Sequence, residues 1–173
     1  VRPLLAALNR DGGRALPMTE SLLSRISGKD NPQMVLGAFE QRWQDPGRIT
    51  PDAGRCWIAL DRVRDPGNLG TIMRTADATG ARGIILIGDC TDPYSVEAVR
   101  ASMGAVFNVE LVQMPEDYFL DLAGGWPGQI VGTALPASRD YRKVDYAGPL
   151  ILLMGNEQAG LTPALMQACT QLV

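Results

Sequence analysis

Residues 56–87 read CWIALDRVRDPGNLGTIMRTADATGARGIILI and decide the fold class of this chain. Cys56–Leu60 is an apolar run of strand length, and Gly83–Ile87 is a second one. Between them, apolar residues recur at helical spacing over Asn68–Thr79, and Gly80 is a typical helix stop. The stretch therefore predicts strand, helix and strand, which is the repeating unit of a parallel sheet.

The same alternation continues toward the end of the chain. Helices are predicted at Ser95–Met103, Glu116–Ala123 and Leu161–Ala168, and strands at Asn108–Val112, Gln129–Thr133, Pro149–Met154 and Gln171–Val173. Because these strands are apolar throughout, both faces of the sheet are expected to be covered. The sequence thus predicts an α/β fold with a parallel sheet and helices on both faces. Such sheets bind ligands at the carboxyl ends of their strands.

The first part of the chain, residues 1–45, has weaker patterns and is predicted to be a separate small unit. Thr19 is a plausible cap for a helix over Glu20–Ser27, and Gln33–Phe39 is predicted to be a short strand. Residues 46–55 contain prolines and glycines and are predicted to be a linker. The main domain is then expected at residues 56–173.

The amino-acid composition limits the kinds of catalytic and metal site that the chain can contain. The 173 residues are 46% hydrophobic and 20% charged, which is typical of a globular protein, and they include no histidine. Histidine triads, histidine-ligated zinc and imidazole bases are therefore excluded. Three cysteines without CxxC spacing argue against a disulfide scaffold or a metal site and favour a reducing cytoplasm. The apolar runs are too short to span a membrane.

The net charge of −3 argues against loose binding of nucleic acid by the molecule as a whole. Basic residues exceed acidic ones by seven to five in residues 1–50, whereas acidic residues exceed basic ones by fourteen to nine in residues 51–173. A polyanionic partner would therefore have to bind a local basic patch.

Polar residues follow the first predicted strand, where an α/β protein keeps its site. Asn68 lies at the start of the predicted helix and Arg74 in its second turn, with Gly67 and Gly70 beside Asn68, but the stretch does not match the dinucleotide fingerprint GxGxxG. One interpretation is that Asn68 and Arg74 face a common cleft. The alternative is that Asn68 only caps the helix and Arg74 is a solvated surface residue.

Two later strands are followed by small or polar residues. Gly155-Asn156-Glu157 comes after the strand that ends at Met154, and it would place a carboxylate at the same edge of the sheet as Asn68. Thr133-Ala134-Leu135 is a second candidate for a ligand-lining loop. An ordinary turn and a plain strand end are the alternatives.

Taken together, these elements closely resemble the SpoU/TrmH family of RNA ribose 2′-O-methyltransferases, which belongs to the SPOUT superfamily. The resemblance rests on Asn-x-Gly-x-x-x-Arg-Thr at 68–75 and Gly-Asn-Glu-x-x-Gly-Leu at 155–161, and it covers residues 56–173. Residues 95–105 are similar to the family's connecting stretch. Residues 1–45 are similar to the end of the L30e-like substrate-binding domain that many members carry.

The resemblance implies an α/β trefoil-knot fold, S-adenosyl-L-methionine as methyl donor, and a homodimer. It implies that Arg74 is the principal catalytic residue, supported by Asn68 and Glu157. It also implies a cofactor pocket lined by Thr133, Ala134, Leu135, Met154, Gly155, Asn156 and Gly160. The family's third motif, which follows the last strand, is expected to be missing from residues 56–173.

Because the chain has no histidine to act as a base, the role of Arg74 in catalysis becomes decisive, and two roles stay open. It could lose its proton and act as a base, or stay charged and hold the adjacent RNA phosphate bidentately. Glu157 is expected to orient Arg74 or Asn68. Contacts with RNA are expected from Arg62, Arg64, Arg139, Arg142 and Lys143, with solvated loop charge as the alternative for each.

Other functions remain open at this point. The rival enzyme is a SPOUT methyltransferase that acts on a base, and the rival class is an RNA-binding or assembly factor that has lost the chemistry. The sequence does not separate ribosomal RNA from transfer RNA as the substrate, although the L30e-like resemblance favours ribosomal RNA.

Overall fold

The structure is a computed structural model that describes residues 6–8, 10, 12–51, 54–135 and 139–173. The chain divides into two units, Val1–Glu40 and Gln41–Val173. The predicted boundaries at 45 and 55 stay predictions.

In the first unit, the expected helix is confirmed as α2 (Glu20–Ser27). The Thr19 hydroxyl accepts a hydrogen bond from the Leu22 backbone N–H at 3.3 Å, and Gly28 ends the helix with a left-handed φ of 63°. The strand predicted at Gln33–Phe39 is wrong, since the structure shows no strand there. An apolar run becomes a strand only where another strand pairs with its backbone, and among the described residues this run has no such partner.

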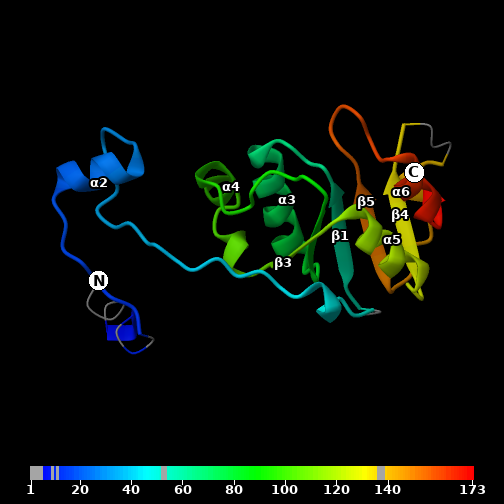
Figure 1. The fold of residues 1–173 in the computed structure, drawn as a ribbon, viewed down its shortest axis with the longest axis horizontal. Coiled ribbons are helices and arrows are strands. Elements are labelled where there is room, and N and C mark those ends of the chain that lie inside the picture. Colours follow the sequence, from blue (N-terminus) through cyan, green and yellow to red (C-terminus); the bar gives the residue numbers. More distant parts are fainter. Residues whose placement is uncertain (1–5, 9, 11, 52–53, 136–138) are drawn as a thin grey trace. The chain divides into compact units, whose positions relative to one another are not determined.

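The second unit is built on one six-stranded sheet in which all neighbours are parallel (Figure 1). The strands are β1 (Cys56–Asp61), β2 (Gly83–Ile87), β3 (Glu110–Met114), β4 (Gln129–Thr133), β5 (Leu150–Met154) and β6 (Gln171–Leu172). Their order across the sheet is β3-β2-β1-β5-β4-β6. The predicted parallel sheet is confirmed, with β3 beginning two residues later than expected.

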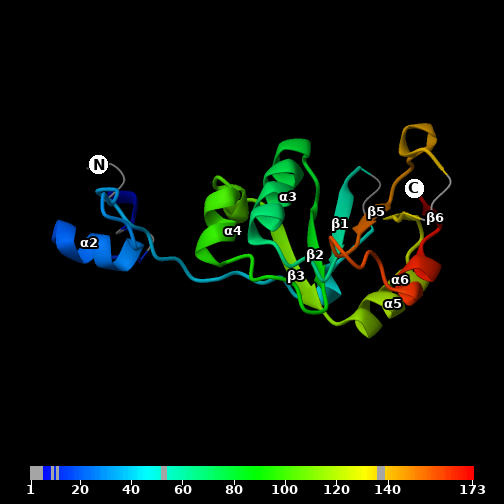
Figure 2. The same ribbon diagram turned by 90° about the horizontal axis from the view of Figure 1, so that it is seen from above.

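Helices cover both faces of this sheet, as predicted. They are α3 (Pro66–Thr79), α4 (Val96–Ala101), α5 (Glu116–Gly124) and α6 (Pro163–Ala168), with short 3₁₀ turns at Pro46–Arg48, Ala105–Phe107 and Tyr141–Lys143. Figure 2 shows α3 and α4 on one side and α5 and α6 on the other. One buried cluster lies under each pair, with Leu69 and Met73 in the first and Phe119 and Leu165 in the second.

The start of α3 settles one of the alternatives left open by the sequence. The cap is Asp65, whose Oδ1 accepts a hydrogen bond from the Asn68 backbone N–H at 2.6 Å, and Pro66 occupies the first turn. The helix therefore begins two residues earlier than predicted. Asn68 is not the cap, so its side chain is available for another partner.

Candidate functional site

The strand register brings the predicted site loops to one edge of the sheet. Leu60 at the end of β1 pairs with Met154 at the end of β5, and Met154 pairs in turn with Thr133 at the end of β4. Because all strands are parallel, the loops after β1, β4 and β5 leave the sheet side by side. We call this end of the sheet the carboxyl edge.

Across this edge, Asn68 meets Glu157. The Asn68 amide nitrogen donates a hydrogen bond to Glu157 Oε1 at 3.2 Å, although the two residues are 89 positions apart in the chain. The backbone N–H groups of Arg64 and Asp65 also point at the carboxylate, at 3.4 and 3.5 Å. The structure thus brings together two of the three predicted catalytic residues.

These contacts set the ionisation of Glu157. Partial burial works to raise the pKa of this carboxyl, but hydrogen bonds from its own backbone, from Asn68 and from the Arg64 and Asp65 backbone outweigh it. The pKa of Glu157 therefore lies below its ordinary value, and the group is a carboxylate at neutral pH. It serves here as an acceptor that holds Asn68 and the start of α3.

The turn that carries Glu157 is closed by its neighbours. The Asn156 side-chain oxygen accepts hydrogen bonds from the backbone N–H groups of Gln158 and Ala159 at 3.0 and 2.9 Å. Gly160 has a φ of 68° and donates its N–H to the Asn156 carbonyl at 2.9 Å. A Cβ on Gly155 would lie 2.3 Å from the Gly160 carbonyl carbon, so only glycine fits there.

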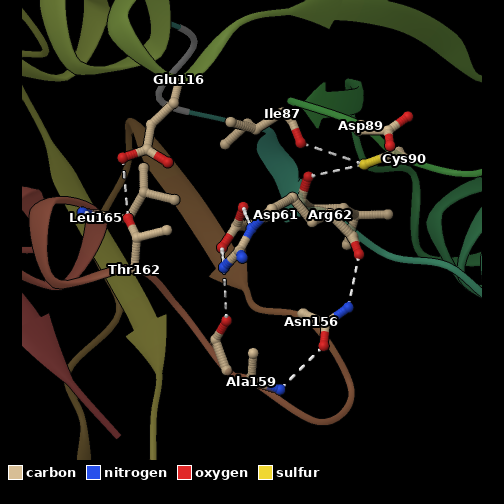
Figure 3. A network of polar contacts seen from close by, with 12 residues as sticks. Asp61, Arg62, Ile87, Asp89, Cys90, Glu116, Asn156, Ala159, Thr162 and Leu165 are labelled. Carbon is tan, nitrogen blue, oxygen red and sulfur yellow. Dashed lines mark hydrogen bonds and ion pairs between the residues drawn. The ribbon is translucent and has the colours of Figure 1, made fainter.

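An ion pair with a buried carboxylate lies next to this turn (Figure 3). Asp61, which is inaccessible to solvent, accepts two hydrogen bonds from the Arg62 guanidinium, at 2.8 and 2.9 Å. The hydrogen bond with Asp61 raises the pKa of Arg62 above its ordinary value. Asp61 was not predicted from the sequence, in which the available signal was an acid and a base at the end of an apolar strand.

Arg74, the third predicted catalytic residue, lies on α3 and is exposed. Its side chain forms no hydrogen bond or ion pair with any residue that the structure describes. The structure therefore does not bring Arg74 onto Glu157, and its guanidinium is open to an external anion.

The expected cofactor loop after β4 is partly described. Thr133 ends the strand, the Ala134 backbone N–H donates to the Val173 carbonyl at 3.0 Å, and Leu135 is fully exposed. Met154 is half-buried at the neighbouring strand end. These residues lie at the same edge as Gly155–Gly160, and their contact with a cofactor stays a prediction.

The residues predicted to contact RNA differ in whether their side chains are already paired within the protein. Arg64 is exposed and pairs with Asp89 at 2.7 Å, whereas Arg62 is committed to Asp61. Beyond the loop after β4, Arg139 donates to Gln171 at 2.7 Å and Arg142 pairs with Asp140 at 2.8 Å. Lys143 is exposed on the same 3₁₀ turn as Arg142. None of these contacts tests binding to RNA.

The cysteines offer no rival chemistry at this edge. Burial raises the pKa of the Cys56, Cys90 and Cys169 thiols, for Cys169 to about 11, so all three are protonated at neutral pH. Within the described residues there is no group of acidic or cysteine side chains that could hold a metal ion. The same residues include no helix with the length and apolarity needed to cross a membrane.

The fold and the site define a class: a parallel α/β protein whose polar side chains converge at the carboxyl edge of the sheet, where proteins of this architecture bind their ligands. Comparison with known proteins then specifies it. The chain belongs to the SpoU rRNA Methylase family, whose model matches residues 55–173.

The chain is also similar to individual proteins with named activities. The 23S rRNA (uridine(2479)-2′-O)-methyltransferase of Streptomyces viridochromogenes is 34% identical over 161 residues, covering 89% of this chain and 56% of its own. The AdoMet-bound rRNA methyltransferase of Sinorhizobium meliloti is 48% identical with a TM-score of 0.94, covering 99% of this chain and 66% of that chain.

A further solved structure also contains the cofactor AdoMet. It is the SpoU methyltransferase AviRb of Streptomyces viridochromogenes, which is 31% identical with a TM-score of 0.74 and covers 91% of this chain and 62% of its own. The chain thus spans between about half and two thirds of the length of these relatives.

Proposed function

We propose that this protein transfers a methyl group from S-adenosyl-L-methionine to a ribose 2′-hydroxyl of RNA. The observation that carries the proposal is the hydrogen bond between Asn68 and Glu157, because it joins the two sequence motifs at the carboxyl edge of the sheet. Family membership and the names of the relatives support the same reaction.

The residues around the ends of β4 and β5 fit the proposed cofactor. Leu135 and Met154 offer exposed and half-buried apolar surface, and the glycines at 155 and 160 let a ligand approach the backbone. In addition, the Gln171 amide nitrogen is buried without a partner among the described residues and is a donor still to be satisfied. S-adenosyl-L-methionine would supply an electrophilic methyl group on its sulfonium.

The chain's own residues would then bind and orient the RNA. Glu157 holds Asn68 and the first turn of α3, which fixes the helix that carries Arg74. An exposed arginine keeps its charge, since a guanidinium is not deprotonated in proteins. We therefore favour Arg74 as a clamp for the phosphate beside the reacting ribose, which stabilises the developing negative charge on the hydroxyl oxygen.

Ribosomal RNA is the proposed substrate, with transfer RNA as the alternative. The names of several relatives specify 23S rRNA, among them the enzymes of Streptomyces viridochromogenes and Bacillus subtilis, while other relatives are named for tRNA/rRNA. Arg64, Arg139, Arg142 and Lys143 are the proposed RNA contacts, because they lie in loops that follow β1 and β4.

The proposal also covers the oligomeric state, the fold type, the N-terminal unit and the location of the protein. We propose a homodimer, a fold of the trefoil-knot type for the domain at residues 56–173, and an L30e-like remnant at residues 1–45 that helps to bind RNA. The resemblance of the chain to the SpoU/TrmH family supports these features. A cytoplasmic location is also proposed, and the three free cysteines support it.

The test is methyl transfer by the full-length protein. Ribosomal and transfer RNA are incubated separately with S-adenosyl-L-methionine labelled on its methyl group, and the modified atom is mapped in the product. Label on a ribose oxygen is the expected result. Label on a base supports the rival methyltransferase, and RNA binding with neither cofactor binding nor methylation supports an assembly factor.

A further inference from the structure

The Asp61–Arg62 pair is more than a surface ion pair. The Asp61 side chain is 1% exposed and the Arg62 side chain 34%, and the guanidinium meets the carboxylate through two parallel hydrogen bonds. A buried carboxylate is costly unless it is fully paired, so the Arg62 side chain is held in one position.

Arg62 reaches the turn at 155–160 with both its main chain and its side chain. Its carbonyl accepts a hydrogen bond from the Asn156 side-chain amide at 2.8 Å, across 94 positions of the chain. Its Nη2 donates to the Gly160 carbonyl at 3.3 Å. Figure 3 shows these contacts on either side of the turn. Arg62 therefore binds both ends of the segment that contains Glu157.

The backbone of Arg62 is itself unusual. Its φ is 51°, in the left-handed region that an arginine rarely adopts, and its N–H donates to the Ile87 carbonyl at 3.1 Å. A strained residue of this kind persists only where its surroundings fix it, and such residues gather at functional sites. Here the strained backbone presents the carbonyl that Asn156 binds.

From these contacts we propose that Asp61 and Arg62 are positioning residues for Glu157. The pair holds the turn at 155–160 at both ends, so that the Glu157 carboxylate stays on Asn68 and on the start of α3. Arg62 acts through Glu157 and does not contact RNA. The proposal rests on the proposed function, and it replaces the expectation that Arg62 binds an RNA phosphate.

Steady-state kinetics separate the two roles of Arg62. In Arg62→Met, loss of the turn's support predicts a kcat at least about tenfold lower, with the KM for RNA and its dependence on salt unchanged. Loss of a phosphate contact predicts a higher KM and a weaker dependence on salt, which would overturn the proposal.

The matched control is Arg82→Met. Arg82 is 36% exposed, close to the 34% of Arg62, and pairs with Glu110 at 3.0 Å, so this variant loses the ion pair of an equally exposed arginine at the opposite end of the sheet. Its kcat and KM are expected to equal those of the wild type. A fall in kcat as large as that of Arg62→Met would show that any lost ion pair has this effect, and would overturn the proposal.

A double-mutant cycle tests whether Arg62 acts through Glu157. If it does, Arg62→Met combined with Glu157→Gln lowers kcat no further than Glu157→Gln alone, because the first change removes only what positions the second group. Fully additive losses would overturn the proposal. Arg62→Gly relaxes the strained φ without restoring the guanidinium, so kcat at the wild-type level there would also contradict it.

Hydrogen exchange provides a readout that needs no activity. The amides of residues 157–160 are expected to exchange faster in Arg62→Met than in the wild type or Arg82→Met, and unchanged exchange would overturn the proposal. Should the wild-type protein fail to methylate RNA, the proposed function is wrong, while the exchange experiment still decides whether Arg62 holds the turn.

Discussion

The two ends of the parallel sheet carry different kinds of polar contact. At the amino end, where β2 and β3 begin, Arg82 and Glu110 form a half-exposed ion pair that joins adjacent strands. At the carboxyl edge, side chains that lie about 90 positions apart in the chain form one connected network. A single exposed pair contributes little, whereas a connected network fixes one arrangement of its groups. The difference indicates that the apolar strands stabilise the sheet and the polar groups of one end serve a site.

The strongest test of this comparison is Arg74, on the helix that leaves the carboxyl edge. Arg74→Ala is expected to lower kcat by about 10²–10³-fold, because it removes the proposed clamp on the phosphate beside the reacting ribose. Its thermal midpoint should match that of the wild type, since the side chain is exposed and has no partner among the described residues. Methyl transfer to RNA and thermal unfolding provide the two measurements.

Arg74→Lys is the companion variant. Lysine keeps the charge but cannot form the bidentate contact, so activity is expected to stay far below that of the wild type. Near-full activity in Arg74→Lys would contradict both of the roles considered for Arg74.

Glu157→Gln should have the next largest effect. Glutamine keeps the shape but loses the charge that the Asn68 amide and two backbone N–H groups bind, which predicts a kcat about 10- to 50-fold lower. Asn68→Ala removes the other partner and should lower kcat by a similar factor. Initial rates at saturating RNA and cofactor measure both, and losses confined to KM would argue against this contact as a determinant of the reaction step.

Alanine substitutions at two glycines, one at each end of the sheet, test the difference between the ends directly. In Gly155→Ala the new Cβ would lie 2.3 Å from the Gly160 carbonyl carbon, and in Gly83→Ala it would lie 2.6 Å from the Glu110 carbonyl oxygen. Each overpacked site should lower the free energy of unfolding by about 1–3 kcal/mol. Only Gly155→Ala is expected to lower kcat as well, by about tenfold, because it displaces the turn with Glu157.

The free energy of unfolding and kcat of both glycine variants are measured at a temperature well below the midpoint of thermal unfolding, so that each variant is folded in the activity assay. An equal loss of kcat in Gly83→Ala would show that the two ends of the sheet do not differ in the way proposed.

The sequence predicted the second unit well because its signals are local. Strands buried on both faces appear as unbroken apolar runs, and Ser95 and Thr162 accept hydrogen bonds at the starts of two helices in this unit. The run at Gln33–Phe39 has a strand-like composition but pairs with no strand among the described residues, and pairing is not encoded in the run itself.

The site was predictable in part for a related reason. Asn68 and Glu157 follow strands that end at the same edge of a parallel sheet, so the fold class alone brings them close. The contacts of Arg62 were not predictable, because they depend on a left-handed φ that arginine rarely adopts and on a turn 94 positions away.

The low pKa of Glu157 makes a prediction about pH. A carboxyl with a lowered pKa contributes stability that is complete above its unfolded pKa, about 4.3, and is lost as the pH falls through the folded value. The difference in thermal midpoint between the wild type and Glu157→Gln should therefore be constant from pH 7 to about pH 5 and shrink at lower pH. A difference that changes between pH 7 and 6 would contradict the direction of the shift.

The smallest effect is expected at the amino end, in Arg82→Gln. Its partner Glu110 is 30% exposed, so water replaces much of what the ion pair provides. The free energy of unfolding should fall by no more than about 1 kcal/mol, and less at high salt, with kcat unchanged. Denaturant unfolding at two salt concentrations measures the first quantity and methyl transfer the second. If Arg82→Gln instead lowered kcat, polar contacts at both ends of the sheet would act on the site, and the carboxyl edge would lose its special role.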